Sequence, residues 1–235
     1  MASSFTTFHR AFNAKIEEPI RVHLRNVYAC LTMATISAAF GAYVDLYTNI
    51  LSNSLFTLIA AIGFLTALNC TRDNGKNQIM RLSFLLGFSF CTGLGLGPLL
   101  EQVISIDPSI IPTALISTTI VFVSFSLSAL MARRGSWLFL GSAITTVLLA
   151  LFVFSLASLF LSSALVFQVH LYVGLLLMCA FVLYDTQLIV EKRHNGDKDF
   201  ISHSVDLFID FIGIFRRLLI ILAQKANDSK DNKRR

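Results

Sequence analysis

The sequence Ala-Phe-Val-Leu-Tyr-Asp at residues 180–185 and the sequence Val-Asp-Leu-Phe-Ile-Asp-Phe at residues 205–211 decide the fold. Each places a carboxylate in a segment that is otherwise apolar enough to be buried in a membrane, where ionisable residues are expensive and usually functional. If the polar link at residues 191–203 lies at one membrane face, Asp185 and Asp210 each lie roughly 9 Å from it, at ~1.5 Å per helical residue. We therefore expect two carboxyl groups at one depth.

The composition indicates a polytopic membrane protein. Of the 235 residues, 55% are hydrophobic and 14% are charged. The net charge of +5 comes from basic residues in the tails and in the connections, which reports topology and is not a nucleic-acid-binding pattern. Cys30, Cys70, Cys91 and Cys179 lack metal-ligand spacing and are interpreted as buried hydrophobes. We predict an all-α bundle in a lipid bilayer, without a tightly bound cofactor.

Hydrophobic runs divide the chain into a short tail, a transmembrane bundle and a second tail. The tails are residues 1–26 and the basic residues 224–235, and the bundle is residues 27–223. Six membrane spans are predicted, at residues 27–47, 54–70, 82–103, 110–132, 138–161 and 164–190. Residues 204–223 form a seventh apolar segment, for which a central span and a re-entrant hairpin are both open.

The distribution of lysine and arginine orients the spans. The N-terminal tail holds four of them, and the six connections that follow hold none, three, none, two, none and three. This alternation predicts a cytoplasmic N-terminus and a cytoplasmic link at residues 191–203. A full crossing by residues 204–223 would then place the basic residues of 224–235 on the outer side, against the same rule.

The seventh segment carries charge along one helical face. Asp206, Asp210 and Arg217 are spaced so that they lie near one side of a helix. Facing lipid, they would cost several kcal/mol each, so this face is expected to point into the bundle. A purely structural alternative is that the aspartates only neutralise Arg216, Arg217 or a basic residue of another helix.

Polar and small residues elsewhere have ordinary structural interpretations. Gly93 and Gly97 have the spacing that lets helices approach closely, and Pro98 favours a kink. Asp45 and Glu101 lie near the ends of their spans and are interpreted as interfacial charges.

The histidines near the predicted membrane faces are also given an ordinary interpretation. His170 is placed at the outer interface. His194 and His203 flank the cytoplasmic link and could add pH sensitivity near neutrality, but the preferred interpretation is that they are solvated loop residues.

Long ordered motifs in this sequence resemble the Bax inhibitor family of transmembrane Bax inhibitor motif proteins, in its eukaryotic endoplasmic-reticulum branch. They are Tyr-Asp-Thr-Gln-Leu-Ile-Val-Glu-Lys at residues 184–192, Gly-Asp-Lys-Asp at 196–199, the stretch 205–211, Gly-Leu-Gly-Leu-Gly-Pro at 93–98, and Ser-Trp-Leu-Phe-Leu-Gly at 136–141. The similarity covers about residues 20–223.

This resemblance implies a helix bundle of the endoplasmic reticulum membrane that acts as a pH-sensitive calcium leak and suppresses cell death. The family's paired-aspartate sensor corresponds here to Asp185 and Asp210, and Asp206 matches a further acidic position. Some relatives add a basic residue, from around the second span, that latches the pair. The candidates for that residue are Arg72, Lys76 and Arg81.

The chemistry of two close carboxyl groups agrees with a gate. In a low-dielectric environment the two groups cannot both ionise readily, so the pair is expected to share a proton. Loss of that proton leaves like charges that repel or recruit a cation. Ca²⁺ prefers about six to eight oxygen ligands. Asp185, Asp206 and Asp210 offer fewer, and weak Ca²⁺ binding suits permeation.

Two rival functions are considered. A non-conducting scaffold could suppress cell death by binding Bax/Bcl-type apoptosis regulators, and the residues do not exclude it. An intramembrane aspartyl protease needs Gly-x-Gly-Asp around its second aspartate, and residues 207–210 read Leu-Phe-Ile-Asp. We therefore predict that the protein is not an enzyme.

Overall fold

The computed structural model describes residues 17–48, 54–158 and 164–234, and all regular secondary structure within these ranges is helical. The helices are α2 (Glu18–Thr48), α3 (Ser54–Cys70), α4 (Gln78–Leu94), α5 (Gly97–Ile106), α6 (Ile110–Met131), α7 (Leu140–Ser158), α8 (Ala164–His194) and α9 (Phe200–Arg234). By length and composition, α2, α6 and α8 could each cross a membrane, as could α4 and α5 together. The predicted all-α membrane bundle is confirmed.

The N-terminal part of the bundle begins earlier than the sequence predicted. Helix α2 starts at Glu18, whereas the first span was expected to start at Val27. Ile20, Leu24 and Val27 are buried along one stripe of this helix. Residues 18–26 therefore belong to the packed bundle and are not part of a polar tail.

The third predicted span is broken. Helices α4 and α5 meet at a bend of 41°, close to Pro98, as the sequence predicted. Gly93, just before the break, lies against α2, because a Cβ at this position would be only 2.0 Å from the carbonyl oxygen of Ala38. The glycine therefore allows the backbones of α2 and α4 to touch, as its spacing predicted.

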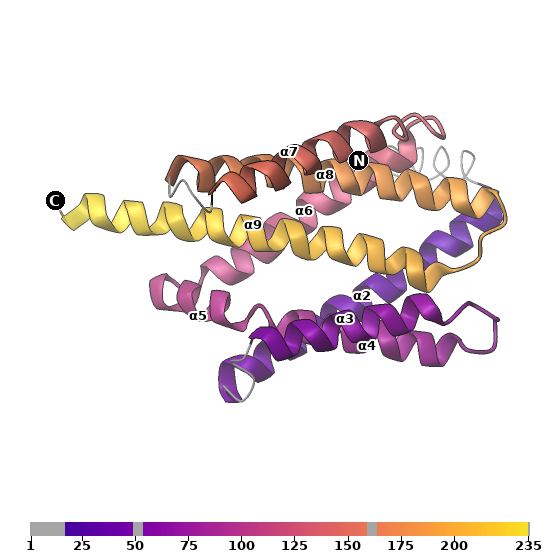
Figure 1. The fold of residues 1–235 in the computed structure, drawn as a ribbon, viewed down its shortest axis with the longest axis horizontal. Coiled ribbons are helices and arrows are strands. Elements are labelled where there is room, and N and C mark those ends of the chain that lie inside the picture. Colours follow the sequence, from indigo (N-terminus) through magenta and orange to yellow (C-terminus); the bar gives the residue numbers. More distant parts are fainter. Residues whose placement is uncertain (1–16, 49–53, 159–163, 235) are drawn as a thin grey trace, which may run out of the picture.

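Helix α9 lies at the centre of the bundle and packs against α8, α2 and α6. Its side chains Leu207, Phe208, Ile214 and Leu219 are fully buried. The helix is continuous from Phe200 to Arg234 and runs along the length of the bundle (Figure 1). Of the two alternatives for the seventh segment, the structure thus has the central helix and not the hairpin.

The two ends of the bundle are made of different connections. Figure 1 shows the α3–α4, α6–α7 and α8–α9 connections at one end, and α5 and the C-terminus at the other. We call the first the basic end, because its connections, residues 71–77, 132–139 and 195–199, follow or contain basic residues. The other is called the opposite end. There, Lys230 near the end of α9 donates a hydrogen bond to the carbonyl oxygen of Ile106 at the end of α5.

Candidate functional site

Successive residues of α8 point to different neighbours, because each helical residue turns the side chain by about 100°. Tyr184 packs against α7, where a Cβ on Gly141 would lie 2.9 Å from its ring. Thr186 shares a hydrogen bond of 3.3 Å with Ser126 of α6. Asp185, between them, faces α9, where its carboxyl group interacts with that of Asp210. One turn of α8 thus contacts three different helices.

Gln187 fixes the orientation of this turn. Its side-chain amide donates to the carbonyl oxygens of Ala129 at 2.9 Å and Arg133 at 3.0 Å. Its oxygen accepts from the backbone amide of Trp137 at 3.0 Å. All polar atoms of this buried amide are therefore engaged at the α6–α7 connection, which holds α8 in one rotation and keeps Asp185 directed at α9.

The carboxyl groups of Asp185 and Asp210 lie next to each other, close enough to interact directly. Asp210 is only 3% exposed, and its Oδ2 has no hydrogen-bond partner among the described residues. An ionised carboxylate only accepts hydrogen bonds, so a bond between two carboxyl groups requires a proton on one of them. Two carboxyl groups this close can share a proton, and a shared proton would join α8 to α9.

The two carboxyl groups lie at one depth from the basic end. Asp185 precedes the end of α8 at His194 by a rise of roughly 14 Å, at ~1.5 Å per residue. Asp210 follows the start of α9 at Phe200 by roughly 15 Å on the same basis.

Asp206 lies one turn nearer the basic end than Asp210 and is partly exposed. Lys192 and Asp199 are the charged groups that act on it most strongly. No three histidine, cysteine or acidic side chains in the described ranges are close enough together to hold a metal ion. The structure therefore does not assemble Asp185, Asp206 and Asp210 into one ligand set.

The arginines of α9 do not neutralise these aspartates in the structure. Arg216 is exposed, and Arg217 is half-buried against α8 at Gly174. Nη1 of Arg217 donates to the carbonyl oxygen of Gly213 at 3.2 Å. Within the described residues, neither arginine forms an ion pair with an aspartate. The alternative that the aspartates only neutralise Arg216 or Arg217 therefore has no contact to support it.

Arg81 is the only one of the three basic latch candidates that is buried in the described structure. Arg72 and Lys76 are exposed in the α3–α4 connection, whereas Arg81 is 2% exposed. Its Nη2 donates to Oδ2 of Asp199 at 2.6 Å and to Oγ of Ser202 at 2.9 Å. Arg81 thus ties α4 to the α8–α9 connection and does not contact the Asp185–Asp210 pair.

Asp199 is held in its ionised form. Burial alone would raise the pKa of its carboxyl group, but hydrogen bonds from Arg81 and from Ser202 outweigh burial and lower this pKa below its usual value. The backbone amide of Ser202 donates to Oδ1 at 3.1 Å. The α8–α9 connection is therefore clamped by a charged pair that stays ionised at neutral pH.

The sequence of residues 20–227 matches the family described as Inhibitor of apoptosis-promoting Bax1. The chain belongs to this family. It is 47% identical over 212 residues to Bax inhibitor 1 of Rattus norvegicus and 45% identical over 212 residues to Bax inhibitor 1 of Homo sapiens, covering 90% of both chains in each comparison. It is 38% identical over 218 residues to Bax inhibitor 1 of Arabidopsis thaliana, covering 92% of this chain and 86% of that protein. The resemblance seen in the sequence is confirmed.

This member of the Bax inhibitor family also contains a buried histidine pair that the sequence analysis missed. Nε2 of His23 lies 2.9 Å from Nδ1 of His203, and Nε2 of His203 lies 3.5 Å from Oδ2 of Asp197. His203 is 2% exposed, so its interpretation as a solvated loop residue was wrong. The sequence feature that could have revealed the pair is the apolar stripe of α2. This stripe includes the position of His23, one turn before Val27, and so predicts that His23 is buried. His194, by contrast, is exposed and lies 3.9 Å from Glu17.

Asp45 was also misplaced by the sequence analysis. It is 6% exposed, whereas an interfacial charge was expected, and its Oδ1 has no hydrogen-bond partner among the described residues. The break between α4 and α5 explains the burial, because it places the N-terminus of α5, which carries partial positive charge, beside Asp45 at Gly97. Glu101, further along α5, is exposed as predicted.

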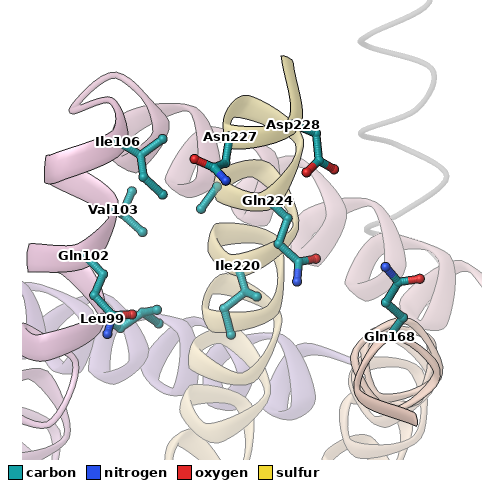
Figure 2. Close-up of a pocket in the computed structure, with 10 residues that line it drawn as sticks. Leu99, Gln102, Val103, Ile106, Gln168, Ile220, Gln224, Asn227 and Asp228 are labelled. Atoms are coloured by element: carbon teal, nitrogen blue, oxygen red, sulfur yellow. The ribbon is translucent and has the colours of Figure 1, made fainter. Parts of the chain in front are cut away.

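A cavity of about 330 Å³ opens at the opposite end of this family member (Figure 2). Its polar lining comes from Gln102 of α5, Gln168 of α8, and Gln224, Asn227 and Asp228 of α9. These side chains offer amide and carboxylate oxygens. Since Gln224 lies more than three turns beyond Asp210 along α9, the cavity and the carboxyl pair are separate polar regions of one central helix.

Proposed function

We propose that this protein is a pH-sensitive Ca²⁺ leak channel of the endoplasmic reticulum membrane that restrains apoptosis and is gated by Asp185 and Asp210. The observation that carries the proposal is the direct proximity of these two carboxyl groups on neighbouring helices. The apoptotic role is supported by the description of the family and by the name Bax inhibitor 1 of the relatives.

The shared proton is the closing element of the gate. With the proton in place, the carboxyl groups attract each other and hold α8 against α9. When the proton leaves toward the basic end, two negative charges remain in contact in a poorly polarisable environment, where like charges repel strongly. The helices then separate or admit a cation between the carboxylates. Acid closes this gate, and a rise toward neutral pH opens it.

The polar groups along α9 suit a weakly bound, mobile cation. Ca²⁺ is a hard ion that takes oxygen ligands, and a site with few protein oxygens binds it weakly. Asp206 lies on the route from the pair to the basic end, and the amide-lined cavity around Gln102 and Gln224 lies at the opposite end. Conduction needs weak, successive sites of this kind.

Ca²⁺ efflux from liposomes that contain the purified protein tests this function. We expect efflux to rise from acidic to neutral pH for the wild type. In Asp185→Asn combined with Asp210→Asn, both side chains stay uncharged at every pH, so efflux should remain at the acid level throughout. Asp73→Asn, a carboxylate in the α3–α4 connection, is the matched control and should keep the wild-type profile.

The same measurement separates the leak from the scaffold alternative. An Asp210→Asn protein whose efflux and pH response equal those of the wild type would refute the gate. If the wild type releases no more Ca²⁺ than empty liposomes at any pH, the protein is instead a non-conducting scaffold that acts through apoptosis regulators.

A further inference from the structure

An apolar seam runs between α2 and α6. Both helices pack firmly against α9 but make few contacts with each other. A cavity of about 510 Å³ lies between them, with Leu31 and Val123 on its walls and Phe211 of α9 at its floor. It shares Thr35 with a cavity of about 230 Å³ toward the opposite end, and Leu130 with one of about 300 Å³ at the basic end. We call this row of neighbouring cavities the α2–α6 seam.

The hydroxyl groups in the seam are already engaged. Thr32, Thr35 and Thr119 donate to carbonyl oxygens of their own helices at 2.8, 2.8 and 2.9 Å. The hydroxyls of Tyr28 and Ser126 are hydrogen-bonded to each other across the seam. The surface left for an occupant consists of methyl groups and aromatic rings. A polar molecule that entered the seam would lose its hydrogen bonds to water without gaining hydrogen bonds to the protein. A hydrocarbon chain has no hydrogen bonds to lose.

The length of the main cavity matches one leaflet of a membrane. Its wall on α6 extends from Thr119 to Leu130, a rise of roughly 16 Å at ~1.5 Å per residue. The hydrocarbon core of a bilayer is ~30 Å thick, so one leaflet contributes ~15 Å. A single acyl chain that enters at the basic end would therefore occupy the cavity along its length.

Positive charge is left over where the seam meets the basic end. Glu17, Glu18 and Glu191, which lie at this end, each have a basic partner, in Glu17–His194, Glu18–Arg21 and Glu191–Arg134. Arg25 lies one turn before Tyr28 on the seam side of α2, and Arg133 follows the last residues of α6. Both are exposed, and neither forms an ion pair within the described ranges. Together they suit an anionic headgroup.

We propose that the α2–α6 seam binds an anionic glycerophospholipid, with one acyl chain between α2 and α6 and the headgroup between Arg25 and Arg133. The proposal does not depend on the Ca²⁺ leak. The bound chain would contact Phe211, next to Asp210, and would lie over Ser126, which is hydrogen-bonded to Thr186 next to Asp185. The lipid would thus touch α9 directly and would reach α8 only through Ser126 of α6.

Native mass spectrometry of the full chain tests the site. The protein is reconstituted into vesicles of phosphatidylcholine with or without phosphatidylserine, extracted in mild detergent, and examined for bound lipid. We expect the wild type to retain phosphatidylserine in preference to phosphatidylcholine. Val123→Trp fills the seam and should abolish the adduct, whereas the matched control Ile120→Trp, on the same helix but outside the seam, should keep it.

A charge variant tests the headgroup site without altering the packing. Arg25→Gln with Arg133→Gln should retain phospholipid but lose the preference for phosphatidylserine, by about fivefold for each arginine. The proposal is overturned if Val123→Trp and Ile120→Trp retain equal amounts of lipid or both lose it. It is also overturned if the wild type shows no preference for the anionic lipid, or if the adduct has the mass of a detergent or of a second chain.

Discussion

The basic end and the opposite end of the bundle bury carboxyl groups in contrasting ways. At the basic end, Asp199 is paired with Arg81, and Asp185 is paired with Asp210 on the neighbouring helix. At the opposite end, Asp45 is 6% exposed, which is more buried than Asp185 or Asp199, yet its Oδ1 has no partner among the described residues and its Oδ2 lies against Gly97. One end uses buried charge to join helices, and the other accommodates it at a helix break.

This difference indicates where the bundle can move. In the function proposed above, the Asp185–Asp210 pair responds to pH, whereas the Arg81–Asp199 clamp keeps the α8–α9 connection in place. The opposite end has an open amide-lined cavity and a helix break in the same region. The predictions that follow test whether the clamp, the break and the pair are as different as their contacts indicate.

The largest expected effect comes from breaking the clamp. Asp199→Ala leaves the guanidinium of Arg81 buried without its counter-charge, and we expect the free energy of unfolding to fall by roughly 3 kcal/mol. This lies at the low end for a buried ion pair because the Asp199 side chain is still 22% exposed. Denaturant unfolding in detergent micelles measures the change.

The neighbouring Asp197 provides the control for this prediction. It lies in the same connection, but its side chain is 43% exposed and its contact with His203 is 3.5 Å. Asp197→Ala should therefore lower the free energy of unfolding by less than ~1 kcal/mol. Equal losses in the two variants would mean that the connection, and not the Arg81–Asp199 pair, sets the stability of the basic end.

The sequence alone predicted much of this architecture, because hydropathy locates the helices and breakers locate their ends. The bend near Pro98, the close approach at Gly93 and the inward direction of Asp210 followed from residue type and spacing. Burial of Asp45 and His203 did not follow. In helices that are apolar around most of their circumference, periodicity does not show which face meets a neighbour. That choice depends on how α4 breaks and how far α2 extends.

The candidate site was predictable to a similar degree. Two aspartates at matching distances from a polar link predict a common depth, but not that their carboxyl groups touch. The contact depends on the rotation of α8, which Gln187 fixes through the α6–α7 connection. Three basic residues were equally good latch candidates by sequence, and only the path of the α8–α9 connection selects Arg81 for Asp199.

A smaller effect is expected at the helix break. A Cβ at Gly97 would lie 1.7 Å from Oδ2 of Asp45, so Gly97→Ala must displace a buried side chain and should lower the free energy of unfolding by about 2 kcal/mol. Gly95 is the matched control, since its Cβ would meet nothing closer than 3.5 Å. Gly95→Ala should stabilise the protein by up to ~1 kcal/mol, because the backbone at Gly95 is in the right-handed helical region, which alanine adopts without strain while restricting the unfolded chain.

The same unfolding assay gives an internal check on this prediction. If the loss in Gly97→Ala comes from contact with Asp45, removing that side chain with Asp45→Ala should make the second substitution much less damaging in the double variant than in the wild-type background. Additive losses would show that α5 needs glycine at this position for another reason, and the contrast between the two ends would lose its structural basis.

The smallest expected effect concerns the stabilisation that the Arg81–Asp199 clamp contributes, which should not depend on pH near neutrality. Because the pKa of Asp199 is lower in the folded protein than in the unfolded chain, its stabilisation is complete above the unfolded value of ~3.9 and is lost only as the pH falls through the folded value. The difference in free energy of unfolding between wild type and Asp199→Ala should therefore be constant between about pH 5 and 8. It should shrink only in stronger acid.

This constancy separates the clamp from the gate at the basic end. In the efflux assay, Asp199→Asn should change the amount of Ca²⁺ released, because the connection is loosened, but it should leave the pH midpoint where it is in the wild type. A shift of the midpoint, or a stability difference that slopes near neutral pH, would show that Asp199 takes up the gating proton. If the midpoint of efflux stays fixed, the groups that titrate between about pH 5 and 8 are not those of the clamp. Asp185 and Asp210 are then the candidates, because their carboxyl groups meet between α8 and α9.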